Sequence, residues 1–405
     1  MNTNWQDGLN ILFDGPYNES PRAALCTAVS GQLIGAYTGY DGTVWTLYTR
    51  MQTTNGALRP PYLMPAFTRN NQKDIDLTAI DGTNEMVAVW ASSHNNGLYR
   101  VYARKYSVSD QGVGTPFPPY PEILASGENG NYVCPRVIYN PTSGLTFVCW
   151  ASDNERELQG IWLDRSLEEQ SYRFGISKDI YSTFYYSGTE LGIAANENIV
   201  LMNQRDSVIV AIQETLSKIN FYRVERPVFG SSRVTLITSY PQANMGKFHA
   251  VLDQSRSTIM LVYVGPQSYV YGDRLRVFGL QDDSPDGSPT PHAEDNQPRA
   301  GIRLNNATYA TGMPYIAALP AQKGQEGPPG FVVAWSCANY GIYYNHFDEL
   351  FNPMAAERQI NPNDSANNYP KVLVSDNQVA IVMQASRFNN NSLAGYGVLT
   401  NVARY

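Results

Sequence analysis

The sequence predicts an all-β fold, namely a seven-bladed β-propeller with four antiparallel strands in each blade. One phrase, an apolar run, a polar turn and a second apolar run, recurs at intervals of about 58 residues, a period typical of propellers and solenoids. The chain is 12% aromatic and only 16% charged, and 32 Gly and 25 Pro divide it into short segments. This composition is typical of a folded, turn-rich β protein. One ring-shaped domain, 1–405, accounts for the length because each repeat buries its apolar face against its neighbours.

The clearest copy of the repeat runs from Phe331 to Phe347. Phe331 to Trp335 has no helical spacing, so it predicts a strand buried on both faces, and the turn through Tyr340 and Gly341 leads into the next strand. Aligning the last bulky residue of each apolar run gives seven repeat positions: Tyr37, Trp90, Trp150, Ile212, Tyr263, Trp335 and Met383. The tryptophans at these positions are interpreted as packing between blades rather than as ligand platforms.

The repeat divides the chain into blades, and the last one lacks a strand. The expected boundaries are 18–68, 73–126, 131–180, 189–239, 246–305, 311–361 and 368–405. The inner strand of the fourth blade is either 191–195 or 199–202. Residues 8–14 are expected to supply the fourth strand of the last blade, because this closes the ring and pairs two edges that would otherwise be exposed.

The stretch 331–372 resembles the propeller-forming repeats of large bacterial surface and exported proteins. Phrases of the type F-V-V-x-W, G-x-Y, F-D and Q-V-N recur in those repeats, and here they match Phe331 to Trp335, Gly341 to Tyr343, Phe347-Asp348 and Gln359 to Asn361. The resemblance covers roughly 45 residues well. It implies architecture and not a ligand, since a fold does not carry a function with it.

Charge and cysteine content exclude several classes of function. A net charge of −7 gives no basic footprint for nucleic acid or anionic lipid. No leader or membrane span is recognised, so we expect a chain that is cytoplasmic as synthesised, and then released or built into a particle. Cys26, Cys134, Cys149 and Cys337 lack metal-ligand spacing and are expected to be buried free thiols. No cofactor or metal is expected, although the acidic loop 281–291 leaves a calcium ion as an alternative.

The loops that follow the second strand of each blade should open on one common face. Aromatic planes beside amides and carboxylates suit a sugar, which has an apolar face and many hydroxyls. The alternative is that Asn and Gly are simply what tight turns require. The candidate ligand-binding residues are Tyr40, Asp41, His94, Asn95, Asn339 and Tyr340.

Basic residues recur where several inner strands begin. They are Arg22, Arg136, Lys247 and Lys371, and three of them directly follow a proline. If these side chains converge, they form an anion site at the mouth of the central channel. The alternative is a set of separate surface or ion-paired residues.

Signals of catalysis are weak. The four histidines lie in different blades without shared spacing, and no nucleophile elbow or phosphate loop occurs. The sequence therefore predicts a non-catalytic recognition or adhesion module that binds a glycan or a glycosylated receptor. The alternatives are a structural component of a larger assembly, such as a phage or exported particle, and a polysaccharide-cleaving enzyme.

Overall fold

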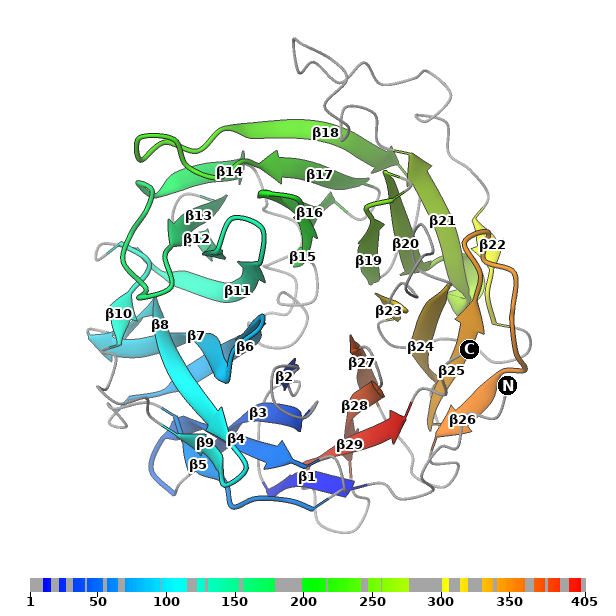
Figure 1. Ribbon diagram of the computed structural model, residues 1–405, viewed down its shortest axis with the longest axis horizontal. Coiled ribbons are helices and arrows are strands. Elements are labelled where there is room, and N and C mark those ends of the chain that lie inside the picture. The colour runs from blue at the N-terminus through cyan, green and yellow to red at the C-terminus, as the bar shows by residue number, and fades with distance from the viewer. Residues whose placement is uncertain are drawn as a thin grey trace.

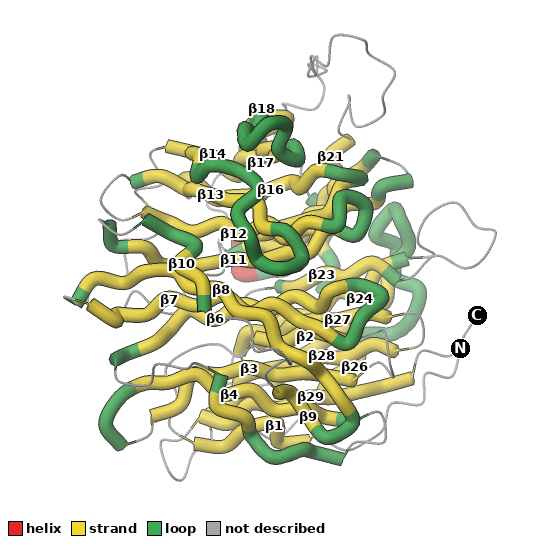
Figure 2. The backbone as a smooth tube through the Cα atoms, turned by 60° about the vertical axis from the view of Figure 1, so that its left-hand side comes forward, coloured by secondary structure: helices red, strands yellow, loops and turns green. Residues whose placement is uncertain are grey.

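A computed structural model describes most of the chain. The described residues are 10–15, 22–26, 32–40, 42–53, 57–64, 70–95, 97–114, 122–127, 130–152, 156–178, 199–215, 218–241, 247–255, 257–276, 301–305, 314–319, 330–337, 341–360, 368–375, 378–386 and 393–401. Nearly all of the regular structure in them is β-strand, with one helical turn, η1 (Pro266–Ser268) (Figure 2). No helix in these ranges is long and apolar enough to cross a membrane.

The described strands form six four-stranded sheets and one five-stranded sheet, all antiparallel. Six sheets therefore have the four strands that the sequence predicts for every blade. The remaining sheet has four strands in this order as well, β6 (Gln72–Ile80), β7 (Glu85–Asn95), β8 (Leu98–Ser109) and β10 (Ile123–Leu124). A fifth, short strand, β9 (Gly112–Gly114), folds back on β8 through a tight turn at Asp110-Gln111.

Each sheet has an inner, a second, a third and an outer strand. The inner strands are β2 (Arg22–Cys26), β6 (Gln72–Ile80), β11 (Tyr132–Asn140), β15 (Ile199–Gln204), β19 (Phe248–Asp253), β23 (Tyr315–Ala318) and β27 (Asn368–Ser375). The second strands are β3 (Gln32–Tyr40), β7 (Glu85–Asn95), β12 (Leu145–Ser152), β16 (Ser207–Thr215), β20 (Thr258–Val264), β24 (Phe331–Cys337) and β28 (Gln378–Ser386).

The third strands are β4 (Trp45–Gln52), β8 (Leu98–Ser109), β13 (Glu157–Leu163), β17 (Lys218–Val224), β21 (Val270–Arg276), β25 (Gly341–Phe347) and β29 (Leu393–Asn401). The outer strands are β5 (Tyr62–Leu63), β10 (Ile123–Leu124), β14 (Phe174–Lys178), β18 (Val234–Pro241), β22 (Ile302–Arg303), β26 (Arg358–Ile360) and β1 (Asn10–Gly15). β1 pairs antiparallel with β29, and of the two candidates for the fourth inner strand 199–202 is correct.

The sheets are arranged radially, with the inner strands around the centre and the outer strands at the periphery (Figure 1). Each inner strand contacts the inner strands of the sheets on both sides, and β2 contacts both β6 and β27. The chain is a β-propeller.

The second strands are the apolar centre of each sheet. Every residue of β24 is buried, and Trp90, Trp150 and Trp335 are at most 1% exposed. Trp90 packs with Ile34 and Leu47 of the preceding sheet. The tryptophans therefore fill the space between sheets, which confirms the packing interpretation. This burial of apolar surface between neighbours is what holds a repeat fold together.

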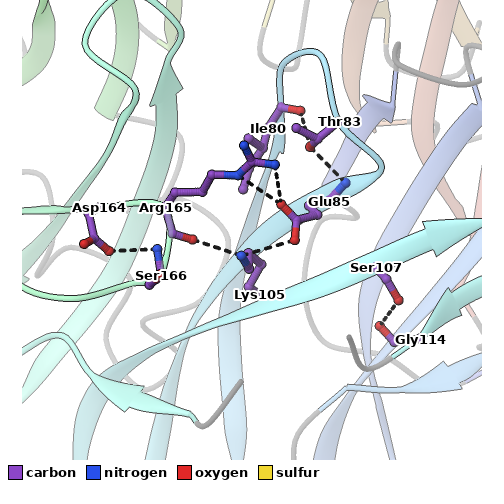
Figure 3. A network of polar contacts seen from close by, with 9 residues as sticks. All are labelled: Ile80, Thr83, Glu85, Lys105, Ser107, Gly114, Asp164, Arg165 and Ser166. Carbon is purple, nitrogen blue, oxygen red and sulfur yellow. Dashed lines mark hydrogen bonds and ion pairs between the residues drawn. The ribbon is translucent and has the colours of Figure 1, made fainter. Parts of the chain in front are cut away.

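Polar contacts also connect neighbouring sheets. The carboxylate of Glu85 lies between Lys105 Nζ and Arg165 Nη2, each at 3.2 Å, and Lys105 Nζ also donates to the Arg165 carbonyl at 3.0 Å (Figure 3). Lys105 is only 2% exposed, so its ammonium needs protein partners such as these to replace the hydrogen bonds that water would otherwise provide. Arg165 belongs to the turn after β13, so the network joins β7 and β8 to the next sheet.

Three cysteines are described, and all three are buried free thiols, as the sequence predicts. Burial, above all, raises the pKa of Cys149 far above its usual range. A thiol that stays protonated is a poor nucleophile and metal ligand. Cys26 is in β2, and its side chain lies outside the described residues.

His346 in β25 should make stability depend on pH. Burial, and secondly Arg358, lowers the pKa of its imidazole from 6.5, and Nε2 is buried with no hydrogen-bond partner among the described residues. Since the unfolded chain binds the proton more readily, stability is full above about pH 6.5 and falls as the pH drops toward the lowered pKa of the folded state.

We therefore expect His346→Gln to remove part of the acid-induced loss of unfolding free energy, by up to about 1.4 kcal/mol per pH unit below pH 6.5. Urea unfolding of both proteins between pH 7 and pH 5 measures it. Parallel stability curves for the two proteins across this range would contradict the assignment.

Candidate functional site

The inner strands bring one residue from each sheet to the same level of the central channel. The level is defined by strand pairing. In the second strand of each sheet we take the residue just before the repeat position, for example Val89 before Trp90, and its partner on the inner strand, here Asp76, lies at this level. We call this set the channel ring, and it comprises Arg22, Asp76, Arg136, Val200, His249, Tyr315 and Lys371. The side chain of Arg22 lies outside the described residues.

The six described side chains of the channel ring line one cavity of about 200 Å³. Thr78, Ile138 and Leu373, two residues further along their strands, line it as well. The ring level is mainly polar and charged, whereas of these three only Thr78 is polar. The cavity thus has polar groups at one level and mostly apolar walls beside it, an arrangement typical of small-molecule sites.

Backbone bulges help to place the charged ring residues. The register of β6 shifts between Lys73 and Asp76, and the register of β11 shifts between Val133 and Arg136. A similar shift in β27 ends at Lys371. Such bulges change the direction in which the following side chains point and are common beside functional sites.

Hydrogen bonds fix β6 against β11. Asp74 Oδ2, Asp76 Oδ2 and Thr78 Oγ1 each accept a hydrogen bond at 3.1 Å from a backbone N–H of β11, those of Cys134, Val137 and Tyr139 respectively. Asp74 and Cys134 have φ angles of 58° and 56°, a left-handed conformation that Asp tolerates better than most residues. These bonds hold Asp76 rigidly at the cavity wall.

The basic group of Arg136 lies beside this carboxylate. Arg136 is 5% exposed, its Nε donates to the Ile199 carbonyl at 3.1 Å, and its Nη1 lies 3.8 Å from Asp76 Oδ1. Lys371 of β27, another wall of the cavity, is 7% exposed. Two cationic side chains therefore face one cavity in the part of the chain that the structure describes.

An aromatic pair forms another wall. The rings of His249 and Tyr315 stack with their centroids 3.6 Å apart and an interplanar angle of 25°. The backbone N–H of Ile316 donates to His249 Nδ1 at 3.5 Å, so the neutral imidazole carries its proton on Nε2. The pair offers a flat apolar surface and a hydrogen-bond donor beside the charged groups.

Some of the predicted residues lie in described strands, where inner strands begin or second strands end. Arg136 and Lys371 line the same cavity, Arg22 has the equivalent register position, and Lys247 precedes β19 and is not among the described residues that line the cavity. Tyr40, His94 and Asn95 end second strands, which in an antiparallel sheet is the edge where inner strands begin. Their side chains, and all of Asp41, Asn339, Tyr340 and the loop 281–291, lie outside the described residues.

Sequence reasoning missed Asp76, Thr78, His249 and Tyr315. Asp76, His249 and Tyr315 share one feature, because each pairs with the second-strand residue that precedes a repeat position. This pairing depends on the length of each hairpin turn. No group of three or more His, Cys, Asp or Glu that could hold a metal ion occurs in the described ranges.

No protein-family model matches the chain, and no curated protein matches its sequence. Several solved structures are similar in fold. The β-propeller domain of the trilobed protease from Pyrococcus furiosus aligns over 96% of this chain and 99% of that chain, at 10% identity and a TM-score of 0.45.

A mutant of the Aleuria aurantia lectin in complex with α-methyl-L-fucoside aligns over 99% of this chain and 96% of that chain, at 10% identity and a TM-score of 0.42. Trypanosoma rangeli sialidase in complex with sialic acid aligns over 98% of this chain and 58% of that chain, at 8% identity and a TM-score of 0.45. At this level of identity the likeness concerns the fold alone.

Asp76 is expected to stabilise the junction between β6 and β11. Asp76→Ala leaves the Val137 N–H without its acceptor and removes the carboxylate from Arg136, so we expect a loss of about 1–3 kcal/mol of unfolding free energy. Asp76→Asn keeps an acceptor and should cost less. Urea unfolding followed by tryptophan fluorescence measures both, and equal losses for the two variants would show that the hydrogen bond does not matter.

Proposed function

We propose that the chain is a non-catalytic recognition module that binds a glycan, or a glycosylated receptor, at the end of the central channel. The observation that carries this proposal is the cavity in which hydrogen-bonding side chains at one ring level adjoin the stacked His249 and Tyr315. Aromatic planes beside paired donors and acceptors suit the apolar face and the hydroxyls of a sugar.

The size of the cavity favours a single sugar unit. Its volume of about 200 Å³ lies below the ~300–1,000 Å³ of pockets for drug-sized ligands. A longer glycan would extend beyond the cavity onto the rim, where Tyr40, Asp41, His94, Asn95, Asn339 and Tyr340 remain the proposed contacts.

A recognition role fits the cavity better than glycoside hydrolysis. Hydrolysis of a glycosidic bond commonly uses two carboxylates about 5 to 10 Å apart. The described lining of the cavity has one carboxylate, Asp76, which already accepts from the Val137 N–H. The proposal is therefore binding without turnover.

We also propose that the sheets are seven blades of one closed ring. Two features support closure. β1 pairs with β29, which would give the last blade its outer strand, and the inner strand β2 contacts β27. A closed ring keeps the inner strands at fixed distances around the channel, which a rigid binding site requires.

A second candidate function is structural, as a component of a larger assembly. Phe229 is fully exposed, and Val228 and Tyr172 are 60% and 75% exposed beside it. The Tyr172 N–H donates to the Gly230 carbonyl at 2.9 Å. This hydrogen bond connects the segment just before β14 to the turn before β18. Exposed aromatic residues gathered in this way are typical of protein interfaces.

The test is binding of the labelled protein to a broad glycan array, with Tyr315→Ala compared with Tyr315→Phe and with Tyr172→Ala as the outer-edge control. We expect selective binding that falls at least tenfold in Tyr315→Ala and persists in the other two variants. His94→Ala/Asn95→Ala and Asn339→Ala/Tyr340→Ala test the rim.

Two outcomes would contradict the proposal. Absence of binding to every glycan, together with multimers that grow with concentration on sizing, would favour the assembly role. Release of product sugars during incubation would show turnover and so an enzyme.

A further inference from the structure

The described part of the channel ring carries more positive than negative charge. Arg136 and Lys371 face the cavity, and Asp76 is the one acidic residue among the described residues that line it. Arg22 holds the equivalent register position in β2. The whole chain has a net charge of −7, so the excess of positive charge in the described part of the channel ring is a local feature and not a consequence of overall charge.

Burial makes these charges significant. Arg136 and Lys371 are 5% and 7% exposed, and an ammonium or guanidinium removed from water is costly unless anionic or polar groups surround it. The Asp76 carboxylate lies 3.8 Å from Arg136 and is also occupied by the Val137 N–H. An anionic ligand group in the cavity would therefore gain from both cations while facing one carboxylate.

The remaining lining indicates what accompanies the anionic group. Beside the cations lie the stacked rings of His249 and Tyr315 and the hydroxyl-bearing Thr78. A group that combines a carboxylate with a ring bearing hydroxyls matches this set. Guanidinium and ammonium groups bind carboxylates through charge-assisted hydrogen bonds.

We propose that the cavity binds the carboxylate-bearing terminal sugar of an acidic glycan, with Arg136 and Lys371 contacting the carboxylate. This inference rests on the proposed glycan recognition and specifies its ligand class. Tyr315 and His249 then contact the sugar ring, and the rest of the glycan leaves the channel toward the rim.

The test compares sugars that differ only in the carboxylate. Isothermal titration of the purified chain with glucuronate and glucose, and with galacturonate and galactose, is expected to show at least tenfold tighter binding of each acid. The preference should shrink at 1 M salt, because ions screen the attraction. This comparison uses the unaltered protein and does not depend on whether a variant folds.

Variants then assign the residues. Lys371→Gln and Arg136→Gln should weaken glucuronate binding about tenfold, and the exposed Lys178→Gln on β14 is the matched control that should not change it. Asp76→Asn should change affinity in the opposite direction and strengthen it severalfold, because it removes the opposing charge. A merely structural role of these residues would not produce the opposite signs.

The results distinguish failure of the acidic-ligand proposal from failure of glycan recognition. Equal binding of acid and neutral sugar, or acid binding that Lys371→Gln and Arg136→Gln leave unchanged, overturns the acidic-ligand proposal while glycan recognition stands. Failure of the glycan array as well overturns the proposed function itself.

Discussion

The inner edge of each blade is the constraint on which this structure depends. An inner strand pairs with its second strand along one edge only, and the other edge points into the channel with unpaired backbone groups. In β11 these groups are satisfied by side chains of neighbouring inner strands, namely Asp74, Asp76 and Thr78 on one side and Asn203 on the other. The inner strands β6, β11 and β15 are thereby fixed against each other in register.

Fixing the register has a consequence for function. Residues at one level of neighbouring inner strands must lie side by side, as the Asp76 and Arg136 pair and the His249 and Tyr315 stack do. The need to satisfy backbone groups also brings polar side chains, Asp76 and Thr78, to the wall of the cavity. A cavity with charged and aromatic walls follows from the same requirement that holds the blades together.

The fold was predictable from sequence because the buried second strands repeat clearly, as in Phe331 to Trp335. The channel ring was only partly predictable. A proline before a basic residue identified Arg22, Arg136 and Lys371, but 15 residues separate Arg22 from Tyr37, 14 separate Arg136 from Trp150 and 20 separate Tyr315 from Trp335. Hairpin turns of unequal length and the bulges at Asp74 and Cys134 hide the common register.

The most direct test of this account is anomalous diffraction from crystals of the chain soaked in sodium bromide. Bromide is a small anion that can enter the cavity, and the account predicts an anomalous peak on the channel axis within about 4 Å of Arg136 and Lys371, as expected for a charge pair. The account would be contradicted if the crystals showed no such peak and the side chains of Arg136 and Lys371 pointed to separate surfaces. The proposed site requires that these two side chains converge on one cavity.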